Sequence, residues 1–141
     1  MSSDGMRYPI EPKIAPLVFS FMSLRVCPPV WSCEGHMSPD GTLRRLPQVW
    51  FYTRSLVFAR LIGDLLAYWH FKKQIANPWH ICVSYSESES DTGFSLEPDV
   101  KMIDRLVLES LQQDVAVLSA LLVSDARAFA QDYLDRYSST G

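Results

Sequence analysis

The chain of 141 residues has few of the features that assign a protein to a familiar class. It contains three cysteines, Cys27, Cys33 and Cys82. An odd number without paired spacing argues against a disulfide scaffold and favours reduced thiols in the cytoplasm. The six glycines form neither a GxGxxG fingerprint nor a GxxxxGK[ST] loop. Nucleotide hydrolysis and hydride transfer on the standard scaffolds are therefore not expected.

Basic charge is also scarce. Thirteen Lys and Arg residues stand against sixteen Asp and Glu residues, and the formal net charge is -3 at pH 7. The pairs at 44–45 and 72–73 are too short to form a basic stripe. Because nucleic acids and anionic membranes are bound through such stripes, we expect neither as a partner.

What is present is the composition of a folded domain. Hydrophobic residues make up 48% of the chain and charged residues 21%, which is ordinary for a globular protein of this size. The apolar stretch over 14–26 is interrupted by Pro16 and Arg25 and is too short to span a bilayer. We expect an arm over residues 1–11, a single domain over 12–137 and a tail over 138–141.

Hydrophobic periodicity predicts an α+β domain. Helical spacing indicates helices over 12–25, 55–73, about 100–123 and 126–137. A new cap at Ser124-Asp125 separates the last two, or they form one bent helix. Alternation indicates strands over 30–34, 48–53, 79–85 and 94–97. The order α-β-β-α-β-β-α(α) contains two hairpins. It predicts a two-layer fold, with an antiparallel sheet of about four strands and amphipathic helices on one face.

The densest polar motif is Trp31-Ser32-Cys33-Glu34-Gly35-His36. In an extended strand, residues two apart point to the same side, so Glu34 and His36 are expected together. Gly35 allows the backbone to bend or a ligand to come close. In a later strand, His80 and Cys82 share a face by the same rule. If the two strands are neighbours, we expect Glu34, His36 and His80 to converge.

This set of side chains is compatible with a metal ion such as zinc, which accepts imidazole, carboxylate and thiolate ligands. In this hypothesis His36 and His80 are ligands and Asp40 or Cys82 is a third. Glu34 then acts as a general base toward bound water. No CxxC, HExxH or HxH spacing is present. A single histidine in a strand is more often a partly buried polar residue than a ligand.

Cys33 is a second catalytic candidate, as a nucleophile activated by a histidine. A regular strand, however, places Cys33 on the opposite face from His36. Free cysteines are also commonly buried, and burial is the simpler prediction. Glu97 would pair with Glu34 as acid and base if their strands were adjacent, although an exposed glutamate at a strand end is the simpler interpretation.

One segment carries a resemblance to a known family. Pro78-Trp79-His80-Ile81 resembles the Pro-Trp-His segment of zinc D-Ala-D-Ala carboxypeptidases, and Ser32 to His36 is similar to the Ser-x-x-x-His of an earlier strand in that family. The resemblance implies an antiparallel sheet with helices and a zinc-binding role for His80. The family's catalytic Glu position is Asn77 here, and its Asp ligand position is Leu43. The peptidase chemistry would then be lost, or rebuilt around Glu34.

Two functions are therefore carried forward. The first is a small binding or interaction protein without chemistry, because no complete catalytic signature is present. The helix over 102–123 has apolar residues on more than one side, including Leu108, Val117 and Leu121, which favours a buried helix or a homodimer interface. The second is a zinc-dependent hydrolase with a site built from Glu34, His36 and His80.

Overall fold

The computed structural model describes residues 10–24, 27–41, 43–53, 56–86, 92–101 and 104–138. Its elements, in chain order, are α1 (Ala15–Leu24), β1 (Pro29–Cys33), β2 (His36–Met37), β3 (Leu43–Arg45), β4 (Gln48–Thr53), α2 (Leu56–Phe71), β5 (Trp79–Ser86), β6 (Thr92–Pro98) and α3 (Arg105–Ser138). The predicted α+β class is confirmed. Strands β2 and β3 lie between the predicted strands over 30–34 and 48–53, where no strand was predicted.

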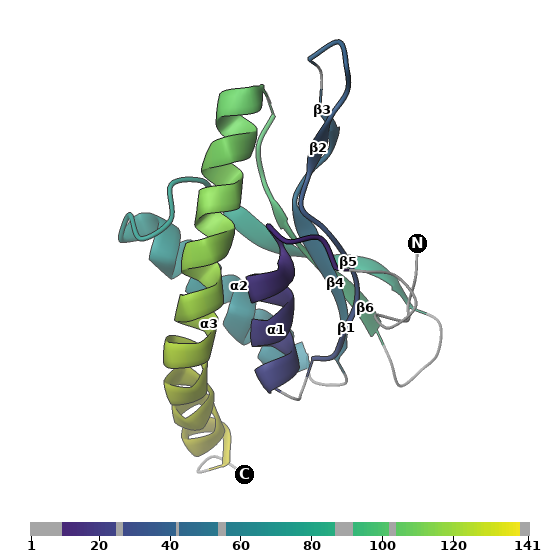
Figure 1. Ribbon diagram of the computed structural model, residues 1–141. Helices are drawn as coiled ribbons and strands as arrows, with labels where there is room; N and C mark the ends of the chain where they lie inside the picture. Colours follow the sequence, from purple (N-terminus) through teal and green to yellow (C-terminus); the bar gives the residue numbers. More distant parts are fainter. Residues whose placement is uncertain are drawn as a thin grey trace.

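The four longer strands form one antiparallel sheet in the order β1-β4-β6-β5 (Figure 1). Both expected hairpin pairs are confirmed, because β1 pairs with β4 and β5 pairs with β6. The pairing of β4 with β6 joins the two hairpins. Strands β1 and β5 therefore lie at opposite edges of the sheet. Strands β2 and β3 form a separate two-stranded ribbon.

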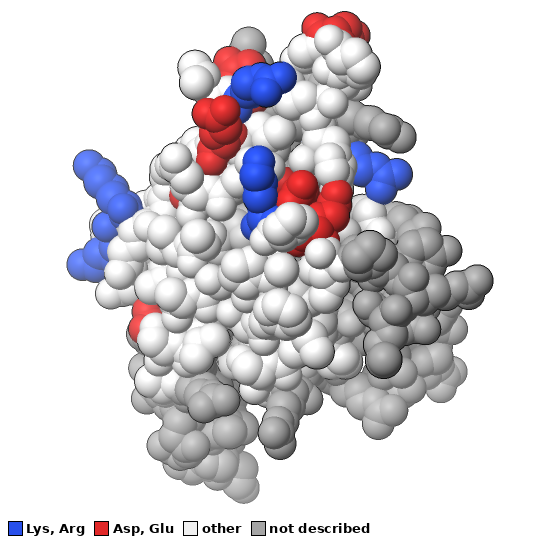
Figure 2. Space-filling view, in the orientation of Figure 1, with Lys and Arg blue, Asp and Glu red and all other residues white. Residues whose placement is uncertain are grey.

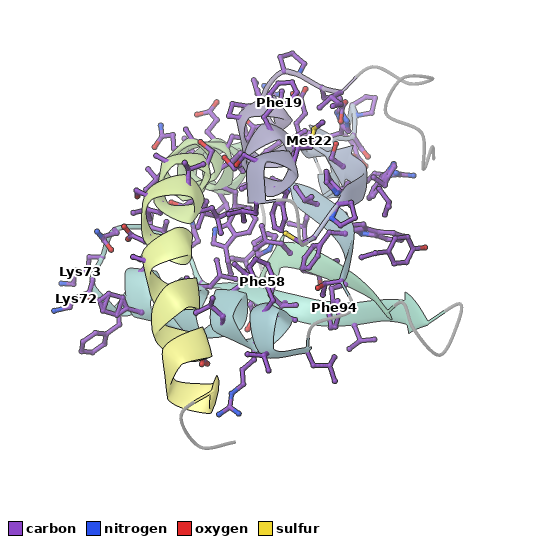
Figure 3. The ribbon with its side chains drawn as sticks, turned by 90° about the horizontal axis from the view of Figure 1, so that it is seen from below. Phe19, Met22, Phe58, Lys72, Lys73 and Phe94 are labelled. Atoms are coloured by element: carbon purple, nitrogen blue, oxygen red, sulfur yellow. The ribbon has the colours of Figure 1, made fainter. Side chains whose placement is uncertain are left out.

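The helices cover one face of the sheet (Figure 1). Along β4, Val49, Phe51 and Thr53 are buried against them, while the alternate residues are only half-buried on the other face. Figure 3 shows side chains filling the space between the two layers, where Phe58 of α2 and Phe94 of β6 belong to the packed core. The other face of the sheet, called here the helix-free face, is the one available to a site.

The C-terminal helix is continuous, so the predicted new cap at Ser124-Asp125 is wrong and the single-helix alternative is correct. The Ser124 hydroxyl donates to the Ala120 carbonyl, one turn back, at 3.1 Å. No glycine or proline occurs between Arg105 and Ser138. The helix begins after Asp104, whose side chain accepts the Val107 N–H at 2.9 Å. Asp104 therefore caps the N-terminus of α3.

One part of α3, Arg105–Asp125, is long and apolar enough to cross a membrane by length and composition. This is the one such helix found in the described part of the chain. A third of its most apolar window is buried inside the protein. The central helix of a soluble domain has the same properties, so this feature alone assigns no location.

Candidate functional site

Two groups of metal-ligating side chains occur among the described residues, one associated with each edge strand. The β1 cluster consists of Glu11, Cys33 and His36, and the β5 cluster consists of His80, Cys82 and Glu97. Within each cluster, one potential ligand atom from every residue lies within 4.8 Å of the others. Each cluster therefore offers one nitrogen, one sulfur and one oxygen donor.

The expected convergence of Glu34, His36 and His80 is wrong. His36 follows β1 and His80 lies on β5, and β4 and β6 separate these two strands. The Glu34 carboxylate accepts the backbone N–H of Lys13 at 2.8 Å, at the start of α1. Asp40 is exposed in the turn before Gly41 and belongs to neither cluster. The order of hairpins in the sheet depends on contacts far apart in sequence, so local patterns did not reveal it.

The β1 cluster depends on a sharp change of direction at Gly35. This residue has φ +90°, a left-handed conformation that favours glycine. A Cβ atom at this position would lie 2.6 Å from Leu108 Cδ1 and 2.9 Å from Pro47 Cδ. The strand is therefore not regular between Cys33 and His36. These two side chains come together even though a regular strand would place them on opposite faces.

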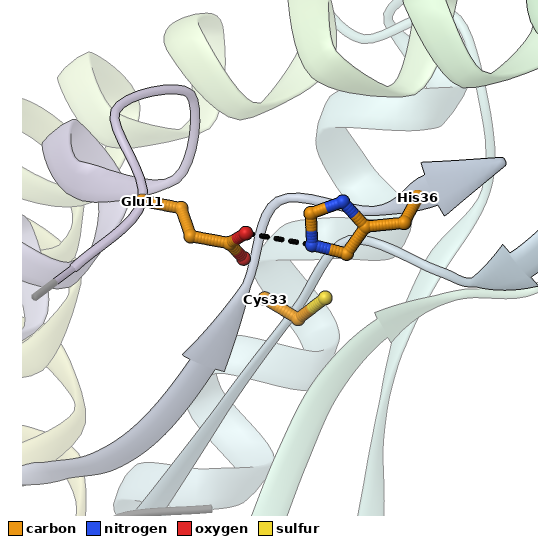
Figure 4. Close-up of side chains that lie close together, drawn as sticks. All are labelled: Glu11, Cys33 and His36. Carbon is orange, nitrogen blue, oxygen red and sulfur yellow. Dashed lines mark ion pairs between the residues drawn. The ribbon is translucent and has the colours of Figure 1, made fainter. Parts of the chain in front are cut away.

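Glu11 is the member that sequence reasoning missed, because it was assigned to the N-terminal arm. Its Oε2 lies 2.6 Å from His36 Nε2, as Figure 4 shows. Its Oε1 accepts the Glu34 N–H at 3.1 Å, and its carbonyl accepts the Ala15 N–H at the start of α1. Ile10 also packs against the core. We therefore place residues 10 and 11 with the folded domain, while 1–9 lie outside the described residues.

Cys33 lies in an environment that keeps its thiol protonated at neutral pH. Its exposed fraction is 2%, and burial raises its pKa above 9.0. The Gly35 N–H donates to Sγ at 3.4 Å and lowers the pKa, while the nearby Glu11 carboxylate raises it. An activated nucleophile instead needs an accessible thiolate. Burial and the raised pKa therefore argue against Cys33 as an activated nucleophile.

The β5 cluster confirms that His80 and Cys82 share a strand face. In the register of β5 with β6, His80 is opposite Glu97 and Cys82 is opposite Ser95. His80 Nε2 lies 3.5 Å from Glu97 Oε1. Burial raises the pKa of the Cys82 thiol, and the Glu97 carboxylate raises it further. Glu97 was expected as an exposed strand end, but its side chain is only 30% exposed.

Aromatic side chains lie between the two clusters on the helix-free face. Trp31 and Trp50 are cross-strand partners, and their rings meet edge to face with centroids 5.0 Å apart. The Arg45 guanidinium lies 5.5 Å from the Trp31 ring. The Trp50 indole donates to Gln48 Oε1 at 2.8 Å. Trp50 therefore helps to cover the helix-free face.

No protein-family model, curated protein or solved structure significantly matches this chain. The resemblance to zinc D-Ala-D-Ala carboxypeptidases stays a prediction. The segments that carry it place their histidines in two separate clusters, so it implies no single assembled site here. The argument for function rests on the clusters themselves.

Proposed function

We propose that this protein binds a zinc-type divalent metal ion through the β1 cluster, and that it is a binding protein rather than a hydrolase. The observation that carries this proposal is the meeting of three donor atoms from Glu11, Cys33 and His36 within 4.8 Å. These residues lie just before α1, at the end of β1 and at the start of β2. An ion at this point would tie three separate backbone segments together.

The donor set favours zinc over the hard cations. Zinc is bound by thiolate, imidazole and carboxylate groups, usually with four ligands in total. Calcium and magnesium take oxygen ligands and do not use a thiolate. Because the cluster offers one donor of each of the three kinds, it suits an ion of borderline softness. The fourth position is left to water or to a small ligand.

Backbone groups orient two of the three ligands. The Glu34 N–H donates to Glu11 Oε1 at 3.1 Å, which leaves Oε2 toward His36. The Gly35 N–H donates to Cys33 Sγ at 3.4 Å. Hydrogen bonds of this kind fix ligand direction in metal sites and stabilise a thiolate. Both donors belong to the backbone of the turn at Gly35, so the ligands are held before an ion arrives.

The arrangement of Glu34 supports binding over hydrolysis. A metal hydrolase needs a carboxylate free to take a proton from bound water. The carboxylate of Glu34 is already used as an acceptor at the start of α1. His36, in contrast, is 41% exposed. Solvent and exchangeable ligands can therefore reach the metal position.

The test is metal content in a protein whose other cluster is disabled. With His80→Ala as background, zinc should bind at one equivalent, measured by elemental mass spectrometry after dialysis. Adding His36→Ala or Cys33→Ser should remove it. Adding His70→Ala, which changes an exposed histidine of α2, is the matched control and should retain it. One equivalent that survives His36→Ala in this background would overturn the proposal.

We also propose a second candidate function, self-association through the surface formed by α1 and α3. Phe19 and Met22 of α1 are 57% and 53% exposed, and Val123 of α3 is 41% exposed. Among the side chains that Figure 2 colours, those over the central part of the face where α1 lies in Figure 1 are mostly uncharged. An apolar surface of this kind is typical of contact with another chain. Sedimentation at rising protein concentration tests it.

A further inference from the structure

We propose that the β5 cluster is a second metal site, distinct from the first, which takes a zinc-type ion on the helix-free face of the sheet. Its residues, His80, Cys82 and Glu97, lie on two adjacent strands. The β1 cluster lies at the opposite edge of the sheet. The two proposals share no residue, so either can fail without the other.

The register of the two strands brings the donors together. His80 and Cys82 are two residues apart on β5, so both point to one face. Glu97 is directly opposite His80 on β6, and cross-strand partners also share a face. The strands are fixed by the hydrogen bonds of the sheet. Ion binding at this point therefore needs only side-chain movement.

The distances suit a small ion. His80 Nε2 and Glu97 Oε1 are 3.5 Å apart, and all three donor atoms lie within 4.8 Å of one another. Zinc–ligand bonds of about 2.0–2.3 Å in a tetrahedron place the ligands roughly 3.3–3.8 Å apart. Donor atoms as much as 4.8 Å apart would have to approach one another by about 1 Å to reach that spacing. An ion pair between His80 and Glu97 alone would not require the Cys82 thiol beside it.

Two neighbouring groups orient the ligands. The Ser95 hydroxyl donates to Glu97 Oε2 at 3.0 Å, which leaves Oε1 toward His80. Asp99 Oδ2 lies 3.9 Å from the other ring nitrogen of His80, Nδ1. A carboxylate beside the non-ligating nitrogen is a recurring partner of metal-bound histidine, because it favours the tautomer that leaves the ligating nitrogen free.

The two sites differ in what the ion joins. An ion in the β1 cluster would link the start of α1 to the β1–β2 turn, whereas one in the β5 cluster would link two strands that are already paired. His80 is 40% exposed and Asp99 is 65% exposed, while Cys33 is almost fully buried. The β5 site should therefore exchange its ion faster and add less to the stability of the fold.

The test is titration of cobalt(II) alone, as a spectroscopic zinc substitute, into the His36→Ala variant. One equivalent should bind and give a thiolate-to-metal absorption band. Adding His80→Ala or Cys82→Ser should weaken binding at least tenfold and remove the band. Adding His70→Ala should change neither. If the His36→Ala protein binds no cobalt, or if His80→Ala leaves the titration unchanged, the β5 site is refuted.

A second measurement uses the unaltered chain and does not depend on how that variant folds. Zinc should protect Cys82 from alkylation at least tenfold, read by peptide mass spectrometry. In His80→Ala the protection should disappear, while any protection of Cys33 should persist. Equal alkylation of Cys82 with and without zinc would refute the site.

Discussion

At the scale of single residues, Gly35 is the position where backbone geometry and the β1 cluster depend on each other. Its left-handed φ and its closeness to Leu108 and Pro47 both exclude a side chain. We expect Gly35→Ala to reduce the free energy of unfolding by about 2–4 kcal/mol, because strain and a steric clash add. Urea denaturation monitored by circular dichroism measures this change.

Two other glycines serve as matched controls. Gly41 also has a left-handed φ, but nothing lies within 4 Å of the added Cβ, so Gly41→Ala should cost only about 1 kcal/mol. Gly63 is helical with open space around it, and Gly63→Ala should stabilise the protein by about 0.5–1 kcal/mol. Equal losses for the variants at Gly35 and Gly41 would show that the contact with Leu108 is unimportant.

Cys27 predicts how stability changes in alkaline solution. It is fully buried, and burial raises its pKa from 9.0 to about 12. Between these values the unfolded chain has released the proton and the folded protein retains it, so stability falls as pH rises. The loss should approach about 1.4 kcal/mol per pH unit. It is absent below pH 9.0, where both states are protonated.

The Cys27→Ala variant isolates this effect. Ionisation of other groups contributes equally to both proteins, so the difference between their free energies of unfolding should shrink as pH rises above 9.0. Urea denaturation at a series of pH values measures it. A difference that stays constant up to pH 11 would contradict the prediction.

Sequence reasoning named four of the six cluster residues as candidate ligands or nucleophiles, from one motif and one strand alternation: Cys33, His36, His80 and Cys82. It named Glu97 for a different role. It missed Glu11, since a glutamate after a loose polar segment carries no local signal. The contact between Glu11 and His36 spans 25 positions, and only the packing of α1 beside β1 creates it.

At the scale of elements, Asp114 of α3 holds the connection between α2 and β5. Its carboxylate accepts the N–H groups of Ala76 and Asn77 at 2.8 and 2.9 Å. It also accepts the Asn77 side-chain amide at 3.0 Å and the Trp79 indole at 3.1 Å. The residue is 4% exposed. These bonds position the start of β5, and therefore His80.

We expect Asp114→Asn to lower the free energy of unfolding by about 3 kcal/mol. The amide keeps the shape but turns one acceptor into a donor facing other donors, which leaves buried N–H groups without partners. Ser110→Ala, one turn earlier on α3, removes a single neutral bond to Asn77 and should cost about 1 kcal/mol. The urea concentrations at the unfolding midpoints compare the two variants. Similar losses of unfolding free energy in the two variants would mean that the Asp114 carboxylate is not what holds the connection between α2 and β5.

Most elements were predictable because their signals are local. Apolar spacing identified α1 and α2, and alternation identified β1, β4, β5 and β6. The false break in α3 arose because Ser124-Asp125 is a good cap in isolation, whereas in the helix the serine hydroxyl bonds one turn back. The β2–β3 ribbon was missed because each strand has two or three residues.

At the scale of the whole molecule, the surface formed by α1 and α3 is the proposed self-contact. If two copies of the chain meet through this surface, the unaltered protein should form an oligomer as its concentration rises. At those concentrations Met22→Lys should lower the sedimentation coefficient toward that of a monomer. A buried lysine at an apolar interface is strongly unfavourable. Val83→Lys is the control, because Val83 is 68% exposed but lies on β5. A concentration-independent monomer for the unaltered protein would contradict this proposal.

The hairpins were predictable, but their order in the sheet was not. The pairing of β4 with β6 joins segments about 40 positions apart, and no residue pattern specified it. That one pairing places the two histidine motifs in two separate clusters instead of one.

The four-stranded sheet has register shifts between Pro29 and Trp31 and between Val83 and Tyr85, and both fall on strands at the edges of the described sheet. A bulge interrupts the row of free N–H and C=O groups and twists the strand away from a flat template. A neighbouring chain cannot easily extend such a sheet by adding its own strand. Fibre growth through the edges is thereby discouraged, even at high protein concentration.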